Sequence, residues 1–340
     1  MSGPARGRRR PGELRDPLAG LGAPLPEDMR PEPGPIAILP TEAAHLVAAV
    51  EAAGGTVAPL GPETRGLVWS HPYDVAGLAA ALRAHSDIGW VQLPWAGVDA
   101  FAEVLREHAE RARPIWTSAK GAYSEPVAEH ALALTLACLR EIPEKARSRS
   151  WAAERTGESL FGRRVLIVGA GGIAQEIVRM LAPFDTAITI VRRQDAPVSG
   201  VDRVLPITRL DEALADADVV ILAAAATGEN RRLLDARRLA LMRRDAVLVN
   251  IARGSLVDAE ALAAALERGH LAGAGIDVTD PEPLPDHHPL WSAPRVVVTS
   301  HSADTEAMTA PLLAARLEAN VRAFLGDGAF IGVVSPSAGY

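Results

Sequence analysis

Short apolar runs alternate with longer alanine- and leucine-rich stretches along the chain from Pro35 onwards. Apolar runs bounded by turn-forming residues predict buried strands, and the stretches between them predict helices. Strands that alternate with helices build parallel sheets, so the pattern predicts an α/β protein. Strands are predicted at residues 36–39, 66–69, 88–93, 165–168, 186–191, 217–222, 246–250, 274–277 and 296–299, and helices at residues 42–53, 75–84, 100–112, from 124 onwards, 173–181, 210–215, 237–242, 258–268 and 306–324.

Two breaks divide this alternation into two domains. The first break lies near Lys120, and the second follows residue 301, after which the last helix returns to the first unit. The predicted fold class is therefore α/β with two doubly wound parallel-sheet domains. A Rossmann cofactor domain of six strands, residues 120–301, is inserted into a flavodoxin-like substrate domain, residues 35–119 and 302–335. Residues 1–34, rich in proline, glycine and arginine, are predicted to be a disordered tail.

One strand-to-helix connection carries a glycine pattern with a clear physical purpose. Gly169-x-Gly171-x-x-Ala174 directly follows the apolar run 165–168. Gly169 permits a tight turn, Gly171 lets the backbone approach a phosphate, and Ala174 allows the next helix to pack closely on the sheet. The amides and the dipole at the start of that helix favour a bound anion. The pattern predicts a binding site for the pyrophosphate of a dinucleotide.

The next strand indicates which dinucleotide. An acid about 20 residues past the first glycine commonly binds the ribose 2′-hydroxyl of NAD. Here the strand ends in Arg192 and Arg193, and no carboxylate precedes Asp195. Two guanidinium groups suit a 2′-phosphate, so NADP is the preferred cofactor and NAD the alternative. The competing interpretation is that one of the arginines is a solvated surface cation.

Three candidate catalytic side chains follow three strands of the second sheet. Arg253 follows the strand 246–250, Glu282 lies beyond 274–277, and His301 follows 296–299. Ligands of open α/β sheets bind beyond the carboxyl ends of the strands. A guanidinium can hold and polarise a 2-oxo acid, an imidazole can pass a proton to its carbonyl oxygen, and a carboxylate can orient that imidazole. This set suits hydride transfer from a nicotinamide.

The composition, with 48% hydrophobic and 23% charged residues among 340, fits an ordinary soluble globular protein. The net charge of −7 argues against a nucleic-acid partner, because phosphate binding needs a basic face. No segment is apolar enough to span a bilayer, so no membrane association and a cytoplasmic location are expected. The single cysteine, Cys138, is expected to be a small buried side chain, and no metal is expected.

Several ordered motifs resemble those of the D-isomer-specific 2-hydroxyacid dehydrogenase family, in particular its glyoxylate and hydroxypyruvate reductases. The resemblance extends over nearly all of residues 60–330. It implies that hydride moves between C4 of the nicotinamide and C2 of a 2-oxo acid. The motifs are the substrate loop 96–99, the helix start 126–130, the segment 248–254 with the catalytic arginine, the segment 277–285 with an aspartate and the catalytic glutamate, and the segment 298–301 with the catalytic histidine.

The resemblance also implies a role for each site residue. His301 would be the general acid in reduction, Glu282 would hydrogen-bond it, and Arg253 would bind the carboxylate and the carbonyl of the substrate. A small 2-oxo or 2-hydroxy acid is the implied partner, together with a second copy of the chain in a homodimer built through the cofactor domain. The implied contacts are Gly172, Ile173, Ile251, Ala252 and Asp277 for the cofactor, and Ala96 and Gly97 for the substrate.

Other interpretations stay open at this point. His287 and His288 also lie near Glu282, although their proline-rich loop favours a structural role. Trp69 and Trp95 each stand where a strand of the substrate domain ends, and either ring is a candidate substrate contact or part of the core. Two other functions share this fold: a cofactor-sensing interaction protein of the C-terminal-binding corepressor type, and a formate or phosphite dehydrogenase. Both remain alternatives to a 2-hydroxyacid dehydrogenase.

Two departures from the family pattern surround the candidate histidine. Ser300 stands where proline is usual, and Asp304 replaces a small residue. Asp304 is expected to cap the following helix, and the alternative is that its charge alters the substrate preference.

Overall fold

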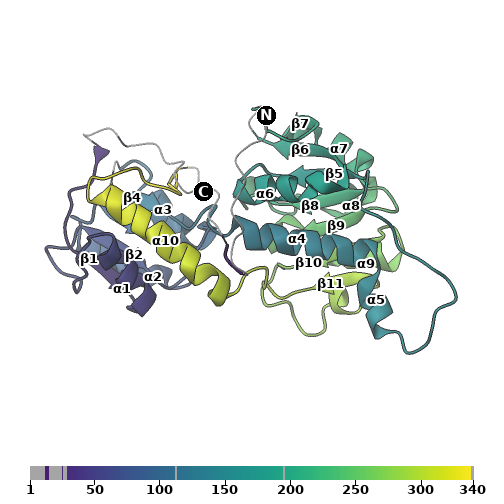
Figure 1. Ribbon diagram of the computed structural model, residues 1–340, viewed down its shortest axis with the longest axis horizontal. Coiled ribbons are helices and arrows are strands. Elements are labelled where there is room, and N and C mark those ends of the chain that lie inside the picture. Colours follow the sequence, from purple (N-terminus) through teal and green to yellow (C-terminus); the bar gives the residue numbers. More distant parts are fainter. Residues whose placement is uncertain (1–11, 15–24, 26–28, 112, 194–195, 338–340) are drawn as a thin grey trace.

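Two parallel sheets, each with helices on its faces, lie side by side in the computed structural model (Figure 1). The structure describes residues 12–14, 25, 29–111, 113–193 and 196–337. The tail expected over residues 1–34 therefore lies mostly outside the described residues. The two-sheet α/β fold that the sequence predicts is confirmed.

The smaller sheet lies in the part of the chain predicted to be the substrate domain, a name kept for it below, and has the strand order β1-β2-β3-β4. A parallel bridge between Ile36 and Val57 extends it beyond β1 by a segment that precedes β2 in the chain. Counting that segment, the order is the flavodoxin-like one. The elements are β1 Ile36–Leu39, α1 Ala44–Ala52, β2 Gly66–Trp69, α2 Val75–Ala84, β3 Trp90–Gln92, α3 Ala102–Glu107, β4 Ile115–Thr117 and, from the end of the chain, α10 Glu306–Phe324.

The larger sheet has seven strands in the order β11-β10-β9-β8-β5-β6-β7. The order reverses between β5 and β8, which is the switch point where open α/β sheets bind ligands. The elements are α4 Ser124–Leu139, α5 Ile142–Arg147, β5 Arg164–Val168, α6 Gly172–Leu181, β6 Ala187–Arg192, β7 Arg203–Pro206, α7 Leu210–Asp216, β8 Val219–Leu222, α8 Ala236–Leu241, β9 Val247–Asn250, α9 Ala259–Glu267, β10 Gly273–Ile276 and β11 Val296–Val298.

Six strands were predicted for this sheet and it has seven, because β7 was not predicted. This strand lies at the edge of the sheet, and only Leu205 of its residues is buried. An edge strand needs no long apolar run, so its sequence carries little strand signal. The short strand β4 and the helix α5 were also not predicted, and the predicted helix 100–112 is shorter, Ala102–Glu107.

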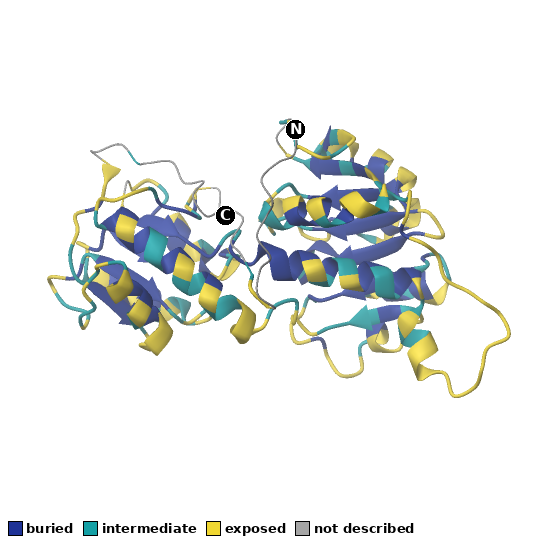
Figure 2. Cartoon of the chain, in the orientation of Figure 1, coloured by how far each residue is buried: buried dark blue, intermediate teal, exposed yellow. Residues whose placement is uncertain are grey.

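Helix α4 packs against the larger sheet and is largely buried (Figure 2). A Cβ added at Gly275 of β10 would lie 2.7 Å from Leu134 Cβ, so the glycine lets the helix approach the strand. Cys138 of the same helix is buried, and burial raises the pKa of its thiol to about 12. It is thus the inert buried side chain that the sequence predicts.

The two domains are joined where the chain crosses between them. Arg316 of α10 is fully buried, and its Nη1 donates to the carbonyl oxygens of Ser118 at 3.1 Å and Lys120 at 2.9 Å. Helix α10 is therefore hydrogen-bonded directly to the first connection between the domains, near Lys120. In the described part of the chain, no helix has the length and apolar character needed to cross a membrane.

Candidate active site

The glycine-rich loop has the shape that a pyrophosphate site requires. Gly169 has φ +113°, and a Cβ there would lie 2.4 Å from the carbonyl oxygen of Ala223. Gly171 precedes α6, and a Cβ at that position would meet nothing within 4 Å. No side chain among the described residues caps the start of α6, where Gly172 and Ile173 lie. Open space beside uncapped amides fits the phosphates of a dinucleotide.

The arginine pair lies at the end of β6, as expected. Arg192 is the last residue of the strand, and its Nη1 donates to the carbonyl oxygen of Ala196 at 3.3 Å. Burial, with the charge of Arg193, lowers the pKa of Lys120. Lys120, which sequence reasoning used only as a domain boundary, therefore lies near enough to Arg193 for the two charges to interact. Asp195 lies outside the described residues.

Glu282 and His301 form a direct pair. His301 Nδ1 lies 3.1 Å from Glu282 Oε2, and both side chains are partly exposed. The two residues follow β10 and β11, which are neighbouring strands. His288 instead accepts a hydrogen bond from the amide of Leu290 at 3.1 Å and caps a short helical turn, while His287 is exposed. The expected structural role of His288 is confirmed.

Arg253 reaches across to the substrate domain. Its Nε donates to Asp99 Oδ1 at 3.0 Å, and its Nη1 donates to the carbonyl oxygen of Ala252 at 2.7 Å. A Cβ added at Gly97 would lie 1.5 Å from Arg253 Nη2, so the guanidinium lies directly over this glycine. Gly97 and its neighbour Ala96 therefore lie beside the arginine, as the expected site requires.

Trp95 connects the same loop to the histidine. Its ring centroid lies 6.4 Å from that of His301 and 5.2 Å from that of Tyr73, and 36% of its surface is exposed. Trp69, the other candidate substrate contact, is only 2% exposed and packs in the core of the substrate domain, so its candidacy as a substrate contact is wrong. Of the two tryptophans, the structure thus brings Trp95 to the catalytic candidates.

Asn250 is a site residue that sequence reasoning missed. It ends β9, and its side chain accepts from Ala252 N at 3.1 Å and donates to the carbonyl oxygen of Arg253 at 3.0 Å. Ile251 and Ala252 between them are buried. Asn250 thereby fixes the turn that presents Arg253. A polar residue at the end of an apolar run was the available signal.

Asp277 is buried within the cofactor domain. Burial by itself would raise the pKa of this carboxyl group, but hydrogen bonds from His130, Thr299 and the amide of Ser302 outweigh burial and lower it. The carboxylate expected on the nicotinamide side therefore points its oxygens at groups of its own domain.

The capping role expected for Asp304 is wrong. Helix α10 begins at Glu306 behind Thr305, and no side chain in the described residues caps it. Burial raises the pKa of Asp304, the charge of His301 opposes that shift, and the charge of Asp277 adds to it. Asp304 is thus a half-buried acid close to the candidate histidine.

Comparison with known proteins places the chain in a family. The model of the D-isomer specific 2-hydroxyacid dehydrogenase NAD binding domain matches residues 132–303. The chain therefore belongs to the D-isomer specific 2-hydroxyacid dehydrogenase family, whose members are oxidoreductases that act on CH–OH groups with a nicotinamide cofactor.

Individual relatives agree with this assignment. An uncharacterized protein in the proB 3′ region of Corynebacterium melassecola is 34% identical over 261 residues, which cover 75% of this chain and 84% of that protein. A glyoxylate reductase of Thermofilum pendens is 37% identical over 201 residues, covering 55% of this chain and 58% of the reductase. The crystal structure of a D-isomer specific 2-hydroxyacid dehydrogenase from Xanthobacter autotrophicus Py2, in complex with NADPH and MES, superposes with a TM-score of 0.76 at 26% identity, covering 91% of this chain and 100% of that one.

Proposed function

We propose that the protein uses NADPH to reduce a small 2-oxo acid, such as glyoxylate or hydroxypyruvate, to the D-2-hydroxy acid. The observation that carries the proposal is the meeting of Arg253 with Gly97, and of His301 with Glu282 and Trp95, around one loop of the substrate domain. The glyoxylate reductase of Thermofilum pendens supports the substrate class.

Arg253 and the loop beside it bind the carboxylate of the substrate. Arginine carries five N–H donors. One is used by Asp99 and one by the carbonyl oxygen of Ala252, which leaves three, and two of these are on Nη2 next to Gly97. These donors, together with the amides of residues 96 and 97, hold the carboxylate and polarise the carbonyl.

His301 supplies the proton. Its Nδ1 faces Glu282, so Nε2 is the nitrogen that donates to the carbonyl oxygen. Glu282 accepts the hydrogen bond from Nδ1 and thereby fixes the orientation of the ring. Bound NADPH supplies a hydride to C2 of the substrate, and the products are the 2-hydroxy acid and NADP⁺.

The preference for NADPH depends on Arg192 and Arg193. The dehydrogenase from Xanthobacter autotrophicus Py2 binds NADPH, which supports a phosphorylated cofactor. Replacing both arginines with serine is expected to raise the KM for NADPH about tenfold, because charged hydrogen bonds to the 2′-phosphate are lost. The KM for NADH is expected to change less than about threefold. Arg268→Ser, at the opposite end of the domain, is the control, and equal effects on both cofactors contradict the proposal.

We also propose that the protein is a homodimer in the cytoplasm, and that its domains have the limits predicted from the sequence. Trp151 is 99% exposed, and Ile142 and Phe161 in the same stretch between α4 and β5 are also exposed. Apolar side chains in one exposed segment of the cofactor domain suit a subunit interface. Sedimentation equilibrium tests the dimer.

The decisive experiment measures initial rates with a panel of substrates and both reduced cofactors. Glyoxylate, hydroxypyruvate, pyruvate and larger 2-oxo acids are tested with NADPH and NADH. Formate and phosphite are tested with NADP⁺ and NAD⁺. Turnover of a 2-oxo acid supports the proposal. Turnover of formate or phosphite alone, or cofactor binding without any turnover, overturns it.

A further inference from the structure

The turn that presents His301 has an unfavourable backbone conformation. Ser300 has φ 41° and His301 has φ 51°, so two consecutive residues with side chains lie in the left-handed region. That conformation costs free energy for residues other than glycine, and it persists only where neighbouring groups hold it. The position of the catalytic imidazole therefore depends on whatever holds this turn.

Asp277 accepts four hydrogen bonds from the turn. Its backbone carbonyl accepts from the amide of His301 at 2.6 Å. Its carboxylate accepts from the amide of Ser302 at 2.9 Å, the amide of Ala303 at 3.2 Å and the hydroxyl of Thr299 at 2.6 Å. The side chain is only 2% exposed, so water does not compete for these bonds. One buried carboxylate thus ties together the residues on both sides of His301.

His130 completes this network from a different element. It belongs to α4, which packs along β10 and β11 (Figure 1). Its Nε2 lies 2.9 Å from Thr299 Oγ1 and 3.4 Å from Asp277 Oδ1, although His130 and Thr299 are 169 residues apart in the chain. The family motif at residues 126–130 contains this histidine, and the proposed mechanism gives it no role.

The direction of the hydrogen bonds follows from the donors available. An ionised carboxylate only accepts, so the hydroxyl proton of Thr299 points to Asp277. Thr299 Oγ1 is then left as an acceptor, and His130 Nε2 must carry a proton to bond it. The chain of bonds runs from His130 through Thr299 to Asp277, and from there to the amides around His301.

We propose that His130 is a positioning residue for catalysis, which holds the left-handed turn of His301 in place through Thr299 and Asp277. The inference rests on the proposed function, since it assigns His301 the proton transfer. It predicts that loss of the Nε2 donor misplaces the catalytic imidazole. The binding of cofactor, which other residues provide, is left intact.

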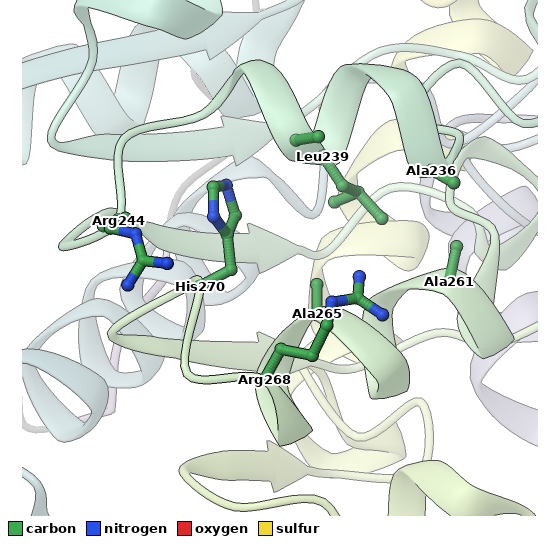
Figure 3. Close-up of a pocket in the computed structure, with 8 residues that line it drawn as sticks. Ala236, Leu239, Arg244, Ala261, Ala265, Arg268 and His270 are labelled. Atoms are coloured by element: carbon green, nitrogen blue, oxygen red, sulfur yellow. The ribbon is translucent and has the colours of Figure 1, made fainter.

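Paired substitutions separate this role from a merely structural one. His130→Leu removes the donor, whereas His130→Gln keeps an N–H near the position of Nε2. His270→Leu is the matched control. His270 is also half-buried, and among the described residues its ring has a hydrogen bond only with the carbonyl oxygen of Met242, at 3.1 Å. It lines a cavity of about 150 Å³ between α8 and α9 (Figure 3). His270 precedes β10, so it lies at the amino ends of the strands, whereas His301 lies at their carboxyl ends.

We expect His130→Leu to lower kcat at least tenfold while the KM for NADPH stays within twofold. His130→Gln is expected to recover most of the lost rate, and His270→Leu to keep the wild-type kcat. The proposal is overturned if His130→Leu turns over at the wild-type rate, or if His130→Gln is as slow as His130→Leu.

A second variant covers the case in which His130→Leu does not fold. Thr299→Val keeps the shape of the side chain and cuts the same chain of bonds at its middle. It is expected to lower kcat by a similar factor. In the double variant the two losses should not multiply, because both remove one connection. Full activity of Thr299→Val, or simple multiplication of the two losses, contradicts the proposal.

Amide hydrogen exchange makes the test independent of turnover. Exchange at residues 299–303 is expected to be at least tenfold faster in His130→Leu than in the wild type, and unchanged in His270→Leu. If the wild type reduces no 2-oxo acid, the proposed function fails, while this measurement still decides whether His130 holds the turn. Unchanged exchange in His130→Leu refutes the inference directly.

Discussion

Two loops that face each other across the candidate site are held in very different ways. The turn at residues 299–303 in the cofactor domain is bonded at its backbone and side chains to buried Asp277. The loop at residues 95–99 in the substrate domain has fewer attachments. The backbone carbonyl oxygen of Trp95 accepts a hydrogen bond from the amide of Ala119 at 3.1 Å, and the Asp99 carboxylate pairs with Arg253 of the other domain. His301, the proposed general acid, thus lies on the more firmly held loop.

This difference separates the expected effects on kcat and KM. A misplaced general acid affects the transition state, so changes in the turn should lower kcat. The loop at residues 95–99 is tied to Arg253 across the domain boundary, so its position depends on how the domains meet around the substrate. Changes there should mainly weaken substrate binding and raise KM.

The largest expected effect comes from removing the general acid on the turn. His301→Gln keeps the size of the side chain but removes a proton that can be transferred at neutral pH. We expect kcat to fall by about 10³, in the range that general acid catalysis contributes. The Kd for NADPH, measured by fluorescence titration, should stay within twofold. A variant that keeps a tenth of the wild-type kcat is incompatible with the role assigned to His301.

A smaller effect is expected on the other loop. Asp99→Ala frees Arg253 Nε and removes this ion pair between the domains, so the guanidinium no longer has a fixed orientation over Gly97. We expect the KM for the 2-oxo acid to rise about tenfold with kcat within about threefold. Glu103→Ala, an exposed carboxylate on the neighbouring helix α3, is the control. A fall in kcat with unchanged KM reverses the comparison between the loops.

Sequence patterns predicted what depends on burial along one strand. The residues of β8 and β9 are all buried, and such continuous apolar runs indicate central parallel strands. The edge strand β7 lacks such a run and was not predicted. The glycine loop, and the order of Arg253, Glu282 and His301 at successive strand ends, followed from the same logic.

What the sequence could not show depends on contacts between distant segments. Trp69 and Trp95 both stand at strand ends, and only packing decides which is buried. The bond between His130 and Thr299 joins α4 to the residue after β11, and no local pattern reveals it. Aspartate is a residue type that often caps helices, yet the helix after Asp304 begins behind Thr305. A short-range motif competes there with the geometry of the domain crossing.

The smallest expected effect concerns the two carboxylates that flank the firmly held turn. Asp277 has a lowered pKa, so its hydrogen bonds stabilise the fold above the usual carboxyl pKa, and this contribution is lost as the pH falls. Burial raises the pKa of Asp304, so the folded state favours its protonated form. The cost of ionising Asp304 is absent in acid and appears as the pH rises through its folded pKa.

Asp304→Asn therefore tests the opposite signs of these two groups. Asparagine has nearly the same shape and no charge, so the variant should match the wild type near pH 4 and melt about 2 °C higher at pH 7, a small effect for a chain of this size. Asp277→Asn should instead lower the melting temperature at pH 7, because the amide cannot replace a carboxylate that accepts several hydrogen bonds. Melting curves of both variants and the wild type at matched pH decide this. If Asp304→Asn is less stable than the wild type at pH 7, the carboxylate beside the turn is a required partner rather than a buried charge, and both ends of the turn are then held by acids.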